Sequence, residues 1–276
     1  MREIASGICL EQPRIPICYN NNYQQVTFSA ERKACLHEFN HLLSISSSTL
    51  NNLINMKISI IGAGSIGGTL ARKLTKLGHE VYIANSRGPE TLTGLAQETG
   101  ATPIAVDKAV NGVDLVIVTI PEKAVPSLSR VFAKAPDDLI IIDTCNYYPH
   151  WRDGYIAGIE ESGMTESEWV QHELGRPIIK AFNNIVYTSL GKQGKVAGTP
   201  GRIALPVAGD NADHKKIVMQ LIDELGFDPV DGGALKDSWR QQPGTPVYIT
   251  NLDVAGLKRA LLEADPTKIA SNRASI

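Results

Sequence analysis

A glycine-rich turn between an apolar run and a helical pattern constrains this chain more than any other feature. Lys57–Ile61 is strongly apolar, and the turn Gly62-Ala63-Gly64-Ser65-Ile66-Gly67 follows it directly. Leu70 and Leu74 then recur at helical spacing, and Gly78 is suited to end that helix. The sequence therefore predicts a strand, a tight turn and a helix in immediate succession.

Each glycine of this turn has a separate physical task. Gly62 permits the tight turn, Gly64 lets a ligand approach the backbone, and Gly67 allows close contact between helix and strand. The free N–H groups at the helix start, at Ser65 and Ile66, favour an anion such as a diphosphate. In this context the Gly-x-Gly-x-x-Gly spacing predicts a dinucleotide site. The alternative is a glycine turn in an α/β unit that binds no nucleotide.

The end of the next strand distinguishes two cofactors. Glu80–Ala84 reads as a strand, and Asn85, Ser86 and Arg87 stand where an NAD enzyme usually carries Asp or Glu. No carboxylate repels a 2′-phosphate there, Ser86 can donate to it, and the Arg87 guanidinium can pair with it. The sequence predicts NADP(H) rather than NAD(H). The alternative is that Arg87 is a solvated surface charge.

Two further apolar runs continue the pattern. Asp114–Pro121 and Leu139–Asp143 read as buried parallel strands, because they are apolar on both faces. Ligands of such sheets bind at the carboxyl ends of the strands. The residues predicted to line the nicotinamide side are Thr119, Ile120, Pro121, Thr144 and Asn146.

Composition excludes several classes of protein. Hydrophobic residues make up 43% and charged residues 20% of the 276 residues, as in ordinary globular proteins. The net charge of -2 gives no reason to expect nucleic acid or an anionic membrane as a partner. No apolar run reaches the length of a membrane span. The four cysteines form no Cys-x-x-Cys pair, and this favours a cytoplasmic protein without a disulfide framework.

The first 55 residues differ from the rest. They hold one of the 24 glycines, carry clusters of Asn and Ser, and show no apolar period. We expect an N-terminal extension that is poorly ordered or not native, with Met56 as the natural start. Within it, His37-Glu38-Phe39-Asn40-His41 matches the zincin pattern. Because no third ligand follows and 55 residues cannot supply the surrounding domain, no metal site is predicted.

The second half of the chain also mixes strands and helices. Pro206 makes a central sheet position less favourable for the strand that contains it. The expected strands are Pro177–Phe182, Arg202–Gly209 and Phe227–Asp231, and the expected helices are 210–225 and 251–264.

These patterns together predict an α/β fold, with a Rossmann-type doubly wound parallel sheet and a small C-terminal α/β domain. The expected organisation has an extension over 1–55, an NADP-binding domain over 56–145, and a domain over 146–276 that completes an acceptor cleft.

Five side chains are candidates for chemistry at the acceptor. Asn183 could bind a carbonyl or the nicotinamide amide, or it is a turn residue, and His150 could relay a proton or lie on the surface. Lys180 could donate to an anionic substrate or extend outward from its strand. Tyr147 and Trp151 could stack on a planar ring or serve as core or dimer contacts. Asn183 and His150 are the predicted catalytic residues.

The chain resembles the coenzyme F420-dependent NADP oxidoreductases, the deazaflavin-dependent NADP reductase family. The resemblance covers about residues 56–235. It is carried by Gly62–Gly68, Asn85–Arg87, Thr119–Pro121, Lys180–Asn183 and Leu225–Gly233.

This resemblance implies a cleft between two domains in which hydride passes directly between the nicotinamide and an acceptor ring. It implies that Ser86 and Arg87 hold the 2′-phosphate, and that Ile120 and Pro121 lie near the nicotinamide. The residues that would hold the diphosphate are Gly64, Ser65, Ile66 and Gly67. A homodimer is a further expectation that no segment of the sequence tests.

The leading interpretation is an NADP(H)-dependent oxidoreductase that transfers a hydride between NADP(H) and a planar redox acceptor such as coenzyme F420 or a flavin. One alternative is a dehydrogenase or imine reductase of a small metabolite, and another is a non-catalytic NADP(H)-sensing protein. The expected partner is a small-molecule redox acceptor, with neither nucleic acid nor a membrane. The sequence predicts neither the identity of the acceptor nor the physiological direction.

Overall fold

The computed structural model describes residues 55–275. Apart from Asn55, the predicted N-terminal extension lies outside these residues, and so does the His37–His41 motif. Within the described range, no helix has the length and apolar character needed to cross a membrane. The same range contains no group of three or more His, Cys, Asp or Glu placed to hold a metal ion.

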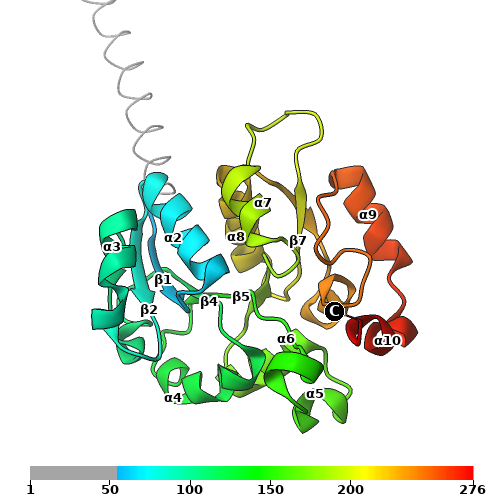
Figure 1. Cartoon of the computed structure of the whole chain (residues 1–276), viewed down its shortest axis with the longest axis horizontal. Helices are drawn as coiled ribbons and strands as arrows, with labels where there is room; N and C mark the ends of the chain where they lie inside the picture. The colour runs from blue at the N-terminus through cyan, green and yellow to red at the C-terminus, as the bar shows by residue number, and fades with distance from the viewer. Residues whose placement is uncertain (1–54, 276) are drawn as a thin grey trace, which may run out of the picture. The chain divides into compact units, whose positions relative to one another are not determined.

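A central sheet of six parallel strands forms the core of the fold (Figure 1). Its strand order is β3-β2-β1-β4-β5-β6, the order of a doubly wound dinucleotide-binding sheet. The strands are β1 (Lys57–Ile61), β2 (Glu80–Ala84), β3 (Thr102–Pro103), β4 (Leu115–Val118), β5 (Ile140–Asp143) and β6 (Ile179–Lys180). The predicted α/β class is confirmed.

Side chains alternate across this sheet and form an apolar cluster on each face. Ile58 and Ile60 of β1 belong to one cluster, together with residues of α2 (Ser65–Lys76) and α8 (Ala212–Glu224). Ile61 belongs to the other cluster, together with residues of η3, α4 and α6. The bounds of these three elements are Glu122–Leu128, Ser129–Phe132 and Glu166–Leu174. Both faces are therefore covered, which explains why β4 and β5 are apolar throughout.

Short helical segments connect the remaining strands. In Figure 1, α3 lies beside α2. The connecting segments are η1 (Pro89–Leu92), α3 (Thr93–Thr99), η2 (Val106–Lys108), η4 (Pro149–Asp153, a π-helix), α5 (Ala157–Glu160) and α7 (Tyr187–Lys192).

A second, two-stranded parallel sheet follows in the chain. Pro206 lies in β7 opposite Val230 of β8, so it interrupts no central strand of the six-stranded sheet. A third apolar cluster packs this sheet against α9. The elements are β7 (Ala204–Val207), β8 (Asp228–Asp231), η5 (Leu235–Gln241), α9 (Val254–Glu263), η6 (Pro266–Lys268) and α10 (Ile269–Arg273).

The two sheets touch at Lys180. Its backbone N–H donates to Ala208 O at 2.8 Å, and Ala208 N–H donates to Lys180 O at 3.0 Å. Because β6 pairs with β5, the large sheet takes its last strand from beyond residue 145. The division of the chain at residues 145 and 146 stays a prediction.

Candidate functional site

The crevice at the carboxyl ends of β1 and β4 is where the strand order reverses, the usual ligand position in such sheets. Two pockets open there and share Gly64 and Thr119–Pro121. The nucleotide pocket has a volume of about 800 Å³ and is lined by residues 61–64, 85–88, 105–107, 119–121, 124, 127 and 128. The aromatic pocket has a volume of about 330 Å³ and is lined by residues 64–66, 119–121, 144–146, 148, 152, 182, 183, 185–187, 248 and 249.

The three motif glycines have different surroundings. Gly62 has a φ of 114°, and a Cβ there would collide with Thr119 O. A Cβ on Gly67 would collide with Gly62 O, so this glycine allows α2 to approach the loop. A Cβ on Gly64 would meet nothing within 4 Å. The open space at Gly64 fits a diphosphate that approaches the backbone.

The first turn of α2 is suited to an anion. Gly64 is its N-cap and supplies no side-chain oxygen to the N–H groups that follow. The first turn of α2 carries no acidic residue. Ser65 is exposed and Ile66 is half-buried at the aromatic pocket. The unpaired donors and the positive end of the helix dipole therefore favour a negatively charged ligand.

The residues after β2 divide into one that shapes the loop and two that face solvent. Asn85 Oδ1 accepts from Arg87 N at 2.9 Å, and Asn85 Nδ2 donates to Thr91 Oγ1 at 2.9 Å. Ser86 and Arg87 are exposed at the nucleotide pocket. The only carboxylate among the residues lining this pocket is Asp107, which lies 3.6 Å from Lys108 Nζ. Arg87 is therefore the cation of this pocket.

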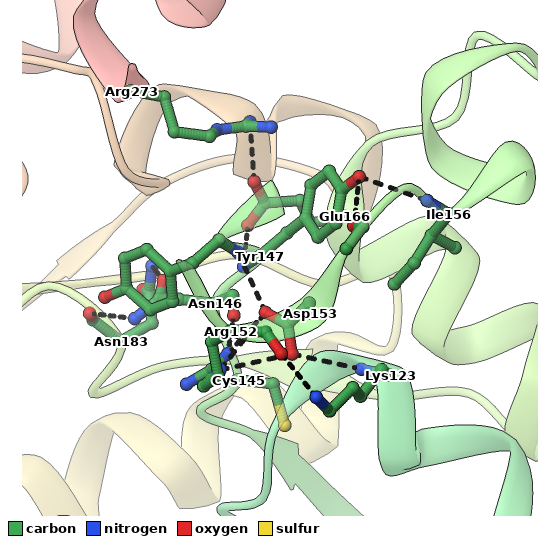
Figure 2. Close-up of polar contacts among 12 residues, drawn as sticks. Lys123, Cys145, Asn146, Tyr147, Arg152, Asp153, Ile156, Glu166, Asn183 and Arg273 are labelled. Atoms are coloured by element: carbon green, nitrogen blue, oxygen red, sulfur yellow. Dashed lines mark hydrogen bonds and ion pairs between the residues drawn. The ribbon is translucent and has the colours of Figure 1, made fainter. Parts of the chain in front are cut away.

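Asn146 and Asn183 meet at the wall of the aromatic pocket (Figure 2). Asn183 Nδ2 donates to Asn146 Oδ1 at 3.0 Å and to Gln241 O at 2.8 Å. Gln241 Nε2 donates to Asn183 Oδ1 at 2.9 Å. Both amide hydrogens of Asn183 are thus engaged within the protein, so its side chain holds Asn146 in place. Gln241 lies in a stretch without an apolar period, so no local pattern in the sequence indicates its role.

Lys180 is buried behind this wall. Its Nζ donates to Asp143 Oδ2 at 2.9 Å and to Cys145 O at 2.5 Å. Burial alone would lower the pKa of Lys180, but the Asp143 carboxylate raises it, so the ammonium stays charged. Lys180 is 0% exposed and lines neither pocket. The expectation that it extends outward is wrong, because the carboxylate partner inside the protein stabilises the buried charge.

Two further carboxyl groups are buried beside this ion pair. Glu122 is 0% exposed, and neither of its carboxyl oxygens has a hydrogen-bond partner among the described residues. Burial, and then Asp143, raise the pKa of Glu122 well above its ordinary value, so the group stays protonated. Glu166 accepts from Arg273 Nη2 at 2.7 Å, which opposes the rise in the pKa of Glu166 that burial causes. Figure 2 shows the chain of contacts from Arg273 through Glu166 to Tyr147.

Tyrosine side chains from distant parts of the chain meet at the aromatic pocket. The hydroxyls of Tyr148 and Tyr248 form a hydrogen bond although 100 positions separate them in sequence. Burial raises the pKa of both tyrosines, so both hydroxyls stay protonated. Phe182 and Ile249 also line the pocket at positive φ values of 62° and 57°. Such backbone strain in bulky side chains is concentrated at binding sites.

Three predicted acceptor residues lie elsewhere. Tyr147 is 0% exposed, and its hydroxyl donates to Gly154 O at 3.0 Å, so it belongs to the core, as one of its two readings expected. His150 is exposed and lines neither pocket. Trp151 is 63% exposed and packs against Tyr148, with the two ring centroids 4.8 Å apart and the ring planes tilted by 37°. Trp151 lines neither pocket.

Comparison with known proteins agrees with this geometry. Residues 57–147 match the family described as NADP oxidoreductase, coenzyme F420-dependent. The predicted resemblance to this family is confirmed over these residues, and the match supports an NADP-dependent oxidoreductase.

Individual relatives extend the likeness. The chain is 44% identical over 63 residues to the protein YjhV of Escherichia coli (strain K12). The matched segment covers 23% of this chain and 46% of that protein. The chain thus spans about half the length of the curated relative it matches.

Two solved structures show the same fold over a longer range. The hypothetical protein SMa0349 of Sinorhizobium meliloti is 29% identical with a TM-score of 0.60, over 71% of this chain and 95% of that one. A protein of Arthrobacter sp. FB24, provisionally assigned as an F420-dependent NADP reductase, is 24% identical with a TM-score of 0.57. This second match covers 67% of this chain and 88% of the other.

Proposed function

We propose that this protein binds NADP(H) along the nucleotide pocket and transfers a hydride to a planar redox acceptor, a deazaflavin or a flavin, in the aromatic pocket. The observation that carries the proposal is that the two pockets share Gly64 and Thr119–Pro121. A dinucleotide that begins at Arg87 and crosses the open space at Gly64 ends where the aromatic pocket begins. Residues 146–276 are proposed as the domain that completes this cleft.

The residues of the nucleotide pocket would hold the cofactor in three places. Ser86 and Arg87 would bind the 2′-phosphate, because they are exposed beside each other after β2. The start of α2, at Gly64–Ile66, would bind the diphosphate. Ile120 and Pro121 would contact the nicotinamide. When bound, NADPH supplies the hydride, and the protein orients the two rings.

The lining of the aromatic pocket favours a planar acceptor. Phe182, Tyr148, Tyr187 and Tyr248 supply aromatic surface, and none of the lining residues is His, Asp, Glu or Lys. Oxidation of an alcohol would need a general base there. Direct transfer of a hydride to a conjugated ring needs only orientation, and this favours the planar acceptor over a hydroxy metabolite.

A second candidate function is the reduction of a small imine or carbonyl compound. The Tyr148–Tyr248 pair favours it, because both hydroxyls remain protonated and could supply the proton that such a product requires. A cytoplasmic location and a homodimer stay predictions from the sequence.

The test of the proposed function follows NADPH oxidation by the full chain with oxidised deazaflavin, FMN, FAD and a small imine as separate acceptors. Turnover with the deazaflavin or a flavin is expected. Turnover with the imine alone would favour the second candidate. Tight NADPH binding without turnover on any of them would favour a sensor and contradict the proposal.

A further inference from the structure

We propose that Arg152 makes the aromatic pocket selective for planar acceptors that carry a negative charge. The inference rests on the proposed function and names the substrate class of the same site. Arg152 lies in η4, which follows Tyr147 and Tyr148 in the segment after β5.

The charge of the aromatic pocket comes from one side chain. Arg152 is the only charged residue among those lining it, and every other lining side chain is apolar, aromatic or uncharged and polar. The carboxylate that pairs with Arg152, Asp153, is fully buried and does not line the pocket. An anionic group of an acceptor would therefore meet a cation and no carboxylate on the pocket wall.

The guanidinium is held rigidly by one edge. Arg152 Nε lies 3.1 Å from both oxygens of Asp153, and Nη2 lies 2.9 Å from Asp153 Oδ2. Nη2 also donates to Asn146 O. Backbone N–H groups in turn fix Asp153. Its Oδ2 accepts from Tyr148 N at 2.9 Å, and its Oδ1 accepts from Lys123 N at 3.4 Å (Figure 2). Because both partners are fixed, Arg152 loses little conformational freedom when a ligand binds.

The other edge of the guanidinium is available to a ligand. No hydrogen bond involves Nη1 within residues 55–275, and the side chain is 26% exposed. The guanidinium carbon lies 4.7 Å from the ring centroid of Tyr148 and 5.7 Å from that of Trp151. The free N–H groups of Nη1 therefore lie beside Tyr148, an aromatic residue of the pocket wall. A ring and an anionic oxygen are recognised together.

Riboflavin and FMN test this inference, because they carry the same ring and differ by one phosphate. The full chain is saturated with NADP⁺, so that no turnover occurs, and binding is followed by the quenching of flavin fluorescence. We expect FMN to bind about tenfold more tightly than riboflavin, as one charge-assisted contact predicts. We expect Arg152→Gln to bring this ratio close to unity.

Two further variants separate charge from structure. Arg152→Lys keeps the cation and should retain part of the preference for FMN. Arg130→Gln makes the same charge change at an exposed residue of α4 that lines neither pocket, and should retain all of it. Because the readout is a ratio of two dissociation constants, a general loss of pocket structure in Arg152→Gln would weaken both flavins and leave the ratio unchanged.

The outcomes are distinguishable. Equal affinity for the two flavins in the wild type, or an unchanged ratio in Arg152→Gln, would overturn the role of Arg152 while leaving hydride transfer to a flavin intact. If NADP⁺ binds and neither flavin does, the flavin acceptor of the proposed function fails and only the deazaflavin stands, and this inference fails.

Discussion

Asn183 and Asn146 exchange two hydrogen bonds across the segments that follow β6 and β5. Asn183 Nδ2 donates to Asn146 Oδ1 at 3.0 Å, and Asn146 Nδ2 donates to Asn183 O at 2.9 Å. This reciprocal pair joins two chain segments that are 37 positions apart, and both residues line the aromatic pocket. Asn183 is thus a positioning residue for the pocket wall.

Asn183→Ala should impair catalysis more than cofactor binding. The substitution leaves Gln241 Nε2 and Asn146 Oδ1 without the Asn183 side chain as partner, so the pocket wall shifts relative to the nicotinamide position. We expect kcat to fall by about 10- to 100-fold, as small misplacements do, while the Kd for NADPH changes by less than about threefold. Steady-state kinetics and NADPH fluorescence measure the two quantities.

The matched control for Asn183 is Asn251→Ala, which removes an amide that donates to Ser189 Oγ and lines neither pocket. It should leave kcat within about twofold. A parallel loss of NADPH affinity in Asn183→Ala would show that Asn183 acts on the cofactor site instead.

Two glycine substitutions should have opposite consequences. Gly64→Ala adds a methyl group to open space at an extended φ of -79°, so the fold should keep its stability within about 1 kcal/mol. The same methyl group occupies the proposed diphosphate position, and NADPH affinity should fall by about tenfold or more. Gly67→Ala collides with Gly62 O and should unfold at lower temperature.

Thermal unfolding without ligand and NADPH titration distinguish the two glycine variants. If Gly64→Ala bound NADPH as tightly as the wild type, the diphosphate would not cross the loop at Gly64.

Arg87→Ala should discriminate between the two nicotinamide cofactors. The exposed guanidinium at the nucleotide pocket would pair with the 2′-phosphate that NADH lacks. We expect the Kd for NADPH to rise by about 10- to 100-fold and that for NADH to change by less than about twofold. Lys134→Ala, at an exposed cation outside the lining of the pocket, is the control. An equal loss of affinity for both cofactors in Arg87→Ala would refute the assignment.

Glu122→Gln should make stability less dependent on pH. Burial raises the pKa of Glu122 in the folded state, so its protonated form favours folding fully below the unfolded pKa, near 4.5. That contribution is lost as pH rises from there through the folded-state pKa. Gln cannot ionise, so the variant should gain about 1 kcal/mol or more over the wild type at high pH.

Urea unfolding at several pH values between 4.5 and 8 measures this difference, and Glu263→Gln, at an exposed residue of α9, is the control. A difference between Glu122→Gln and wild type that stays constant with pH would show that the Glu122 carboxyl is already ionised in the folded protein.

The sequence predicted the nucleotide half closely, because its signals are local. The strand Lys57–Ile61 appears at the predicted residues, and the turn after it has glycine at Gly62 and Gly67, where a Cβ would collide with the backbone. The helix predicted over 251–264 begins at Val254 because Asp253 accepts from Gly256 N as its N-cap. The strand predicted over 177–182 contracts to Ile179–Lys180, since Phe182 adopts a φ of 62°.

The acceptor side was less predictable, because distant segments assemble it. Tyr248 lies between regular elements, and nothing near it in sequence indicates that it meets Tyr148. Glu122 stands next to the predicted residue Pro121, yet only the packing of α6 against η3 shows that it is buried. Lys180 was placed on its strand correctly, but its carboxylate partner lies 37 positions away on β5. Local patterns do not contain such pairings.

The central claim is that a hydride passes directly from NADPH in one pocket to a ring in the other. NADPH deuterated on either face of the nicotinamide tests it most directly, with the full chain, oxidised deazaflavin as acceptor, and mass spectrometry of the reduced product. Deuterium from one face alone should appear on the ring carbon of the deazaflavin that accepts the hydride. Absence of reduction, or reduction with the deuterium lost to water, would contradict the account.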